Sequence, residues 1–282
     1  MYKLRNKSGL RFADLIDRLA ELAPDVRFRF TSPHPKDFPE KLIDVIKKNN
    51  NICKQIHLPA QSGSSKVLKN MRRYYSREAY LNLTDFIRSK MPYIALSSDF
   101  ISGFCEETEE DFKETLSLIE EVKYDMAFLF AYSMREKTHA YHNLSDNVSE
   151  EVKKIRLNRM IDVFRRIQLE RNKEDLGRYH LVLVEGFDRR NKNKLVGRTD
   201  TNKLCIFENE KVASEIPKYL RERAINETTA INSNLTELKK GDYAVVRVDD
   251  CSNNTLYCTG IAYAKSLKEF FEFSEGKPFI HI

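Results

Sequence analysis

The stretch IALSSDFISG, residues 94–103, decides the fold of this chain, because it reads as a buried strand that ends at a glycine. Thr108 and Asp111 follow with the spacing of an N-cap and a capping-box acid, so a helix is expected to begin there. The buried stripe of that helix recurs at three- and four-residue steps in Phe112, Leu116, Ile119 and Val122. The apolar stretch MAFLFA, residues 126–131, then reads as a second strand. This order predicts parallel strands joined by a helical crossover.

The same alternation extends upstream of this unit. The periodicity predicts helices near residues 12–22, 42–46, 64–71 and 76–89, and strands at VRFRFT (26–31) and QIHL (55–58). Four parallel strands are too few for an eight-stranded barrel, so we expect part of an α/β sheet or barrel. The first strand exposes a bare sheet edge unless something upstream covers it. We therefore expect the chain to start in the middle of a domain.

The pattern changes after a long helix predicted from Ser149 to about Asp175, which stops at Gly177. Beyond it, short apolar runs with period two predict a small antiparallel β-barrel; these runs lie at 179–185, 195–198, 204–207, 243–248 and 255–258. A polar stretch near 211–239 is expected to be a loop or insertion. The expected domains are 1–177, the barrel at 178–265 and a tail at 266–282.

Composition gives weaker limits on function. The net charge of +6 slightly favours a polyanionic partner, although a mixed solvated surface also explains it. The five cysteines have no metal-ligand spacing, and their odd number argues against a disulfide framework, which fits a reducing compartment. No apolar run approaches the roughly 20 residues of a membrane helix, so no membrane association is expected.

Three predicted strand ends carry polar residues where a parallel sheet binds its ligands. In one of them, TSPHP (31–35), His34 stands between two prolines in a rigid extended loop, although a plain surface turn explains it as well. The loop HLPAQSGSS (57–65) opens a helix, so its free N–H groups favour an anion, although an ordinary loop with a serine cap explains it as well. Asp99 lies within a buried strand and therefore needs a hydrogen-bonding partner, such as a ribose hydroxyl or an arginine. Glu107 precedes a helix start, where an acid is also favoured by the helix dipole alone.

Two further segments are basic. Arg135 and Lys137 follow the last predicted strand of the sheet, where they could meet a phosphate or carboxylate or lie in an exposed loop. In the predicted barrel, basic residues cluster beside Phe187 and Phe207, as in barrels that bind single-stranded RNA; they are Arg189, Arg190, Lys192, Lys194, Arg198 and Lys203.

Taken together, these segments resemble the radical S-adenosylmethionine (radical SAM) tRNA methylthiotransferase family, which is MiaB-like. The resemblance rests on RFTSPHP (29–35), HLPAQSGS (57–64), SSDFISGF (97–104) with Glu107 and Thr108, and FLFAYSMR (128–135), which is closest to the animal mitochondrial branch. LVEG (183–186) and GRTD (197–200) are similar to the start of the family's TRAM domain, a small RNA-binding barrel. Only the C-terminal part of the family pattern is present.

The resemblance implies an α/β chain: part of a radical-SAM (βα) partial barrel, followed by a TRAM-like barrel. It implies methylthiolation of tRNA at C2 of isopentenyladenosine beside the anticodon, with S-adenosylmethionine and 4Fe-4S clusters as cofactors of the full-length family. It places the cofactor-binding positions at Gln61, Ser62, Ser64, Ser98, Asp99 and Glu107. The expected RNA-binding residues are Arg189, Arg190, Lys192 and Arg198. It also implies a mitochondrial location. The chain itself does not indicate this compartment, and its residues alone predict only a soluble intracellular protein.

Two departures from the family pattern are visible. The cluster motif C-x-x-x-C-x-x-C is absent from the 282 residues, so no metal ligands are assigned, and we expect the family's N-terminal half to cover the barrel edge. The usual Gly-Phe-Pro-Gly-Glu-Thr stands here as GFCEET, residues 103–108. Three hypotheses remain: part of a methylthiotransferase, a non-catalytic RNA-binding module, or an unrelated α/β-barrel enzyme.

The first prediction concerns activity. The 282-residue chain, purified alone, should not methylthiolate an isopentenylated tRNA, because it carries no thiolate set that could bind the cluster which reduces S-adenosylmethionine. Mass spectrometry of the nucleosides after incubation with reductant and S-adenosylmethionine checks this. Any methylthio product above the no-protein background would contradict it.

Overall fold

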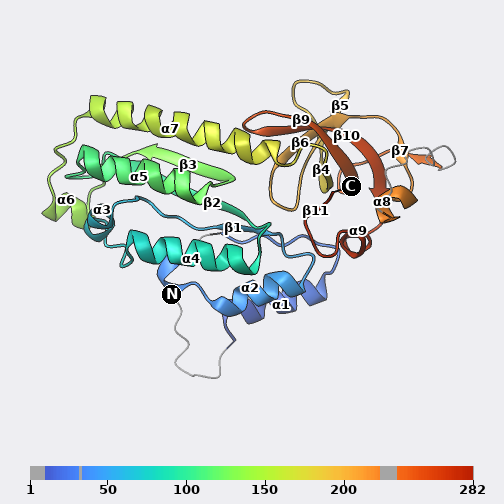
Figure 1. Cartoon of the computed structure of the whole chain (residues 1–282), viewed down its shortest axis with the longest axis horizontal. Helices are drawn as coiled ribbons and strands as arrows, with labels where there is room; N and C mark the ends of the chain where they lie inside the picture. Colours follow the sequence, from blue (N-terminus) through green and yellow to red (C-terminus); the bar gives the residue numbers. More distant parts are fainter. Residues whose placement is uncertain (1–9, 32–33, 223–233, 282) are drawn as a thin grey trace.

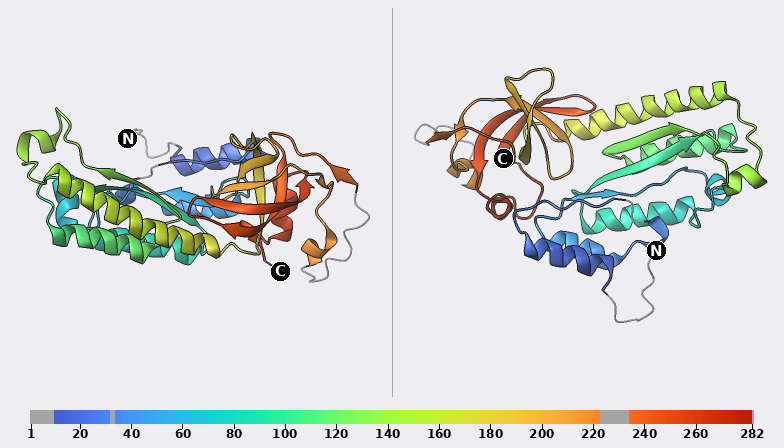
Figure 2. Two further views of the ribbon diagram at one scale, coloured as in Figure 1. Left: turned by 90° about the horizontal axis from the view of Figure 1, so that it is seen from above. Right: turned by 180° about the vertical axis from the view of Figure 1, so that it is seen from behind.

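The computed structural model describes residues 10–31, 34–222 and 234–281. Figure 1 shows an α/β unit that leads through one long helix, α7 (Glu150–Lys173), into a β-barrel unit. The two views in Figure 2 show the same two units lying end to end. No helix in these described ranges combines the length and the apolar character needed to cross a membrane.

A three-stranded parallel sheet is the centre of the first unit. Its order is β1 (Gln55–His57), β2 (Ala95–Ser102) and β3 (Met126–Ala131). The expected strand at 26–31 is wrong as a strand, because it contributes only one bridge, between Phe28 and Ile52. The neighbouring arginine side chains are instead turned towards the barrel unit, as described below.

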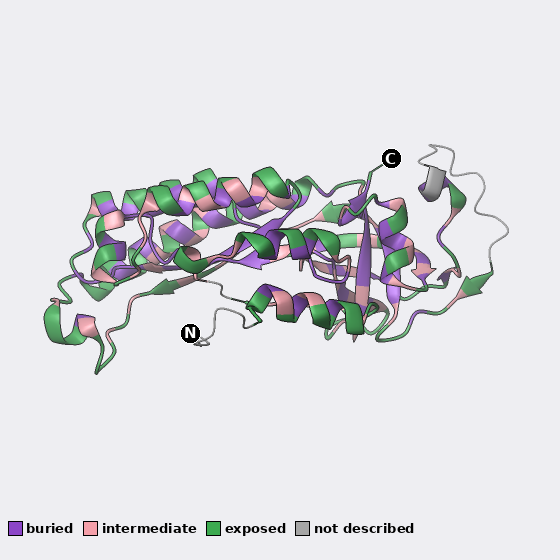
Figure 3. Cartoon of the chain, turned by 90° about the horizontal axis from the view of Figure 1, so that it is seen from below, coloured by how far each residue is buried: buried purple, intermediate pink, exposed green. Residues whose placement is uncertain are grey.

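Helices cover one face of this sheet. The elements of the unit, in chain order, are α1 (Phe12–Leu22), the 3₁₀ turn η1 (Pro35–Asp37), α2 (Glu40–Lys48), α3 (Ser65–Asn70), α4 (Arg77–Lys90), α5 (Glu109–Val122), α6 (His139–Asn143) and α7. The shared core joins Phe100 of β2 to Ile87 of α4, Phe112 of α5 and Phe164 of α7. Figure 3 shows buried and exposed residues alternating along these helices, as amphipathic helices require.

The opposite face of the sheet is partly open. It carries His57, Asp99, Phe128 and Phe130, and we call it the open face. The two phenylalanines are 49% and 51% exposed, which is unusual for aromatic residues of a parallel sheet. This face is where the polar residues at the strand ends become accessible.

The second unit is a closed barrel of five strands. They are β4 (Tyr179–Phe187), β5 (Lys194–Arg198), β6 (Leu204–Glu208), β9 (Tyr243–Cys251) and β10 (Thr255–Ala264). Four of the five pairings are antiparallel, but β6 and β10 pair in parallel and close the barrel. The barrel is therefore mixed, whereas the sequence pattern predicts an antiparallel one, because period-two alternation does not reveal strand direction.

The expected insertion and tail both add structure to the barrel. The described parts of 211–239 are β7 (Val212–Ala213), α8 (Lys218–Glu222) and β8 (Leu235–Thr236), while 223–233 lie outside the described residues. Residues 266–282 contain α9 (Leu267–Phe273) and β11 (Phe279–Ile280), which pairs with β4. The segment expected to be a tail is thus part of the barrel unit.

Arginine side chains from the first unit dock onto backbone carbonyl groups of the barrel. The Arg27 guanidinium donates to the carbonyls of Arg198 (2.8 Å) and Leu181 (2.7 Å) and lies over the Tyr243 ring. Arg29 donates to the carbonyls of Thr199 and Asp200. Backbone acceptors have fixed positions, so these bonds set the orientation of the two units.

We predict that Arg27→Met lowers the free energy of unfolding by about 2–3 kcal/mol, because two charge-assisted hydrogen bonds are lost at a half-buried position. Urea unfolding followed by circular dichroism measures this. Arg18→Met is the control, since Arg18 is exposed on α1, and it should unfold like the parent. Equal stability of the two variants would show that the arginine contacts do not hold the units together.

Candidate functional site

The carboxyl end of β1 and the middle of β2 bring a histidine and a carboxylate together on the open face. His57 Nε2 lies 3.4 Å from Asp99 Oδ1, and its Nδ1 lies 3.0 Å from the Ser97 hydroxyl. The His57 ring packs edge-to-face on Phe128 of β3. Asp99 keeps 28% of its side chain exposed, whereas His57 is nearly buried. The sequence indicated Asp99, and its need for a partner is met by His57, which sequence reasoning did not select.

Gln61 lies beside Asp99 at the same edge. Its backbone N–H donates to the Asp99 carbonyl, and its carbonyl accepts from Ile101 N–H. This pairing requires a positive φ of 71° at Gln61, which is uncommon for a residue other than glycine. Within the described part of the chain, the Gln61 amide side chain makes no hydrogen bond, and the residue is 7% exposed.

The serines of the expected cofactor loop point into the protein. The Ser62 hydroxyl bonds with that of Thr115, 3.1 Å away, and the Ser64 hydroxyl donates to Asp111 Oδ1 at 2.7 Å. The Ser98 hydroxyl accepts from Ala60 N–H. All three serines are at most 1% exposed. In this structure they shape the loop; Gln61 is also largely buried, whereas Asp99 keeps 28% of its side chain exposed.

Glu107 is also engaged inside the protein. Its Oε2 accepts from Gly103 N–H at 2.7 Å and from the Arg156 guanidinium at 2.9 Å. Burial raises the pKa of the Glu107 carboxyl, and the bonds from Gly103 and Arg156 act against this rise. The side chain is fully buried. Glu107 therefore braces the turn after β2 against α7.

The expected RNA-binding residues lie on the barrel. Arg189, Arg190 and Lys192 are exposed in the turn between β4 and β5. Arg198 is half-buried, donates to the Asn202 carbonyl and lies 3.6 Å from Glu185. The structure thus separates Arg198, which is held by the protein, from the three cations of the turn.

A hollow of about 660 Å³ adjoins this turn. Phe187, 52% exposed, lines it together with Leu195. Three lysines line it as well, and sequence reasoning missed them because they lie in and after the polar insertion: Lys211, Lys239 and Lys240. Exposed cations around an aromatic ring are the arrangement that single-stranded nucleic acids bind.

The cysteines do not form a metal site. Cys53, Cys105 and Cys205 are buried in separate places, and Cys251 and Cys258 are half-buried in the barrel. Among the described residues, which include all five cysteines, no group of three or more His, Cys, Asp or Glu side chains is placed to hold a metal ion. These residues do not fit an iron–sulfur cluster.

Comparison with known proteins identifies similar sequences. The family model of the radical SAM superfamily matches residues 7–119. The mitochondrial tRNA methylthiotransferase CDK5RAP1 of Mus musculus is 49% identical over 250 residues, 89% of this chain and 40% of the relative. The tRNA-2-methylthio-N(6)-dimethylallyladenosine synthase of Porphyromonas gingivalis is 49% identical over 226 residues, 80% of this chain and 48% of the relative.

Among solved structures, coproporphyrinogen III oxidase from Escherichia coli, a radical SAM enzyme, covers 96% of this chain with a TM-score of 0.48 and 14% identity. The chain spans less than half the length of the two curated relatives described above.

The loop that carries Gln61 is held by Asp111, which accepts a hydrogen bond from Ser64, so its stability depends on the ionisation of that carboxyl. Burial by itself raises the pKa of Asp111, but hydrogen bonds from Thr108, Ser64 and Lys66 lower it to about 2 overall. A depressed pKa means that the carboxylate contributes stability above pH 4, and that this contribution is lost as the pH falls towards 2.

We predict that Asp111→Asn removes about 2 kcal/mol of stability at pH 7 and flattens the dependence of stability on pH between 4 and 2. Urea unfolding at a series of pH values measures both effects. Glu110→Gln, at an exposed acid on the same helix, should retain the parent's profile. A parallel loss in both variants would assign the effect to overall charge.

Proposed function

Because the chain belongs to the radical SAM tRNA methylthiotransferase family and matches the C-terminal part of its members, we propose that it takes part in 2-methylthiolation of isopentenylated adenosine in tRNA. The identity of 49% over 89% of the chain is the observation that carries this proposal. The relatives' names supply the reaction, and the open face and the barrel supply the surfaces on which it would depend.

We propose that the open face binds S-adenosylmethionine. Support comes from the Asp99 carboxylate, which keeps 28% of its side chain exposed, and from Gln61, whose backbone pairs with that of Asp99 and whose amide makes no hydrogen bond among the described residues. A carboxylate and an amide are suited to the hydroxyl groups of a ribose, and a carboxylate also attracts a sulfonium. Ser62, Ser64, Ser98 and Glu107 would act by holding this loop and strand in place.

The iron–sulfur chemistry of the family has no ligands among these residues, so no reaction step is assigned to this chain through a cluster. This observation also supports a second candidate function, that of a non-catalytic tRNA-binding module. The two candidates share the RNA-binding barrel and differ only in whether a cluster-bearing part acts with it.

We propose that such a part is the N-terminal portion of the family, and that it covers the open face. The half-exposed Phe128 and Phe130 support this, because covering them with another protein surface would remove apolar area from water, which lowers the free energy. A mitochondrial location is proposed from the printed names of the mammalian relatives.

For tRNA binding we propose the turn between β4 and β5 and the adjoining hollow. Arg189, Arg190 and Lys192 supply exposed cations there, and Phe187 supplies a stacking surface. Arg198 would contribute less, because its guanidinium is already held by Asn202.

We predict that the triple variant R189Q/R190Q/K192Q binds tRNA at least ten-fold more weakly and reduces the slope of log affinity against log salt by about 2 to 3. Fluorescence anisotropy with a labelled tRNA between 50 and 200 mM salt measures both quantities. R18Q/K268Q, which removes exposed charges on α1 and α9, is the control and should change binding little. Identical salt slopes for the two variants would place the RNA elsewhere.

A further inference from the structure

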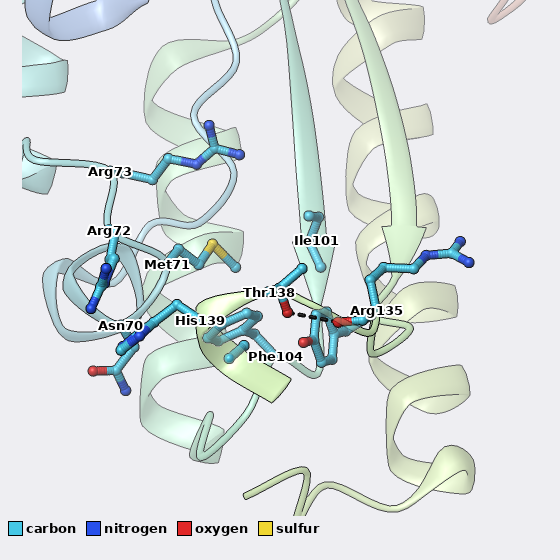
Figure 4. A pocket seen from close by; sticks show the side chains of 11 residues that line it. Asn70, Met71, Arg72, Arg73, Ile101, Phe104, Arg135, Thr138 and His139 are labelled. Carbon is cyan, nitrogen blue, oxygen red and sulfur yellow. Dashed lines mark hydrogen bonds between the residues drawn. The ribbon is translucent and has the colours of Figure 1, made fainter. Parts of the chain in front are cut away.

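A second basic hollow, of about 200 Å³, lies at the carboxyl ends of β2 and β3. Ile101, Phe104 and Tyr132 form its apolar wall, and Phe104 packs edge-to-face on Tyr132 with ring centroids 4.7 Å apart. Figure 4 shows the basic residues at its rim: Arg72 and Arg73 come from the connection between α3 and α4, and Arg135 comes from the loop after β3 on the opposite side, with the Arg72 and Arg135 guanidinium groups pointing away from each other. These segments are distant in sequence, so only the fold collects their charges here.

Five other arginines described in the same unit are held by carboxylates, unlike those at the hollow. Arg77, Arg156, Arg159, Arg166 and Arg171 each pair with a carboxylate. Within the described ranges, the guanidinium groups at the hollow have no carboxylate partner, and no Asp or Glu lines the hollow. The Nε of Arg73 is buried and has no hydrogen-bond partner in the described structure. Arg72 and Arg135 are exposed, so their guanidinium groups can meet an acceptor from outside.

The charge of the hollow decides the class of that acceptor. S-adenosylmethionine carries a sulfonium, an ammonium and one carboxylate, so its net charge is positive and three uncompensated arginines would repel the molecule as a whole. A phosphodiester is anionic and presents oxygen acceptors that match the guanidinium fork. The aromatic wall of Phe104 and Tyr132 adds a surface suited to a nucleobase or ribose. The chemistry therefore favours a strand of RNA over the cofactor.

The position of the hollow relates it to the reaction site. Ile101 lies two residues after Asp99 on the same face of β2, a separation of roughly 7 Å along a strand. Successive phosphates of a nucleic acid strand are of similar spacing, so a strand held at the hollow brings a neighbouring nucleotide beside His57 and Asp99.

We propose that Arg72, Arg73 and Arg135 bind a backbone phosphate of the tRNA strand that flanks the modified nucleotide. This inference rests on the proposed function and adds to it an RNA contact separate from the barrel. The barrel would supply affinity for the tRNA body, and the arginine hollow would hold the strand that carries the reacting base.

The test uses the full 282-residue chain and an RNA stem-loop, with binding followed by fluorescence anisotropy. R73M/R135M should bind about ten-fold more weakly and lower the salt slope by about 1. K137M is the matched control, because Lys137 carries the same charge on the Arg135 loop but does not line the hollow, and it should bind like the parent.

Stem-loops with a single neutral methylphosphonate at successive positions give the second measurement. For the parent protein, a methylphosphonate at one position should weaken binding about ten-fold. For R73M/R135M, a methylphosphonate at that position should weaken binding no further. If each methylphosphonate weakens the binding of R73M/R135M as much as it weakens the binding of K137M, the arginine hollow does not bind a phosphate. If the parent binds no stem-loop but R189Q/R190Q/K192Q still weakens binding of whole tRNA, the inference fails and the barrel proposal stands.

Discussion

The close approach of one loop to one helix is the constraint on which the site depends. Gly63 lies so near α5 that a Cβ atom there would be 2.2 Å from the Glu114 carbonyl oxygen. Its N–H donates to Thr115, and the neighbouring Ser64 donates to Asp111. Because the loop after β1 is fixed in this way, Gln61 must pair with β2 in a left-handed conformation. Its backbone N–H then donates to the Asp99 carbonyl.

The second constraint is the contact between the α/β unit and the barrel, which is made through hydrogen bonds to backbone carbonyl groups. Arg27 and Arg29 donate to barrel carbonyls, and the Asp200 carboxylate accepts from Lys54 N–H at 2.8 Å. On the other side, Lys203 reaches Asp175 at 2.6 Å, beside Asp125 and Arg171. Bonds on both sides of the junction resist rotation of the barrel. The barrel is therefore held at a defined angle to the sheet.

Charge is distributed unevenly along the carboxyl edge of the sheet. Asp99 with His57 forms a site that tolerates a cationic ligand, whereas the arginine hollow one step further along β2 favours an anion. The half-exposed Phe128 and Phe130 lie on the same face, in a region that a further protein surface could bury.

The sequence by itself determined the elements and the family, because both are written in local patterns. The Thr108–Asp111 capping box is confirmed, as are the strands within 94–103 and 126–131 and the long helix before Gly177. Only the tertiary structure decided which polar side chains face outward: Ser62, Ser64 and Ser98 turn inward and Asp99 outward, since the loop's contacts with α5 and the phase of β2 set their directions. It also decided that residues 26–31 contact the barrel through their arginines instead of forming a strand of the sheet, and that β6 pairs with β10 in parallel. Both outcomes depend on contacts between residues far apart in sequence, which no local pattern specifies.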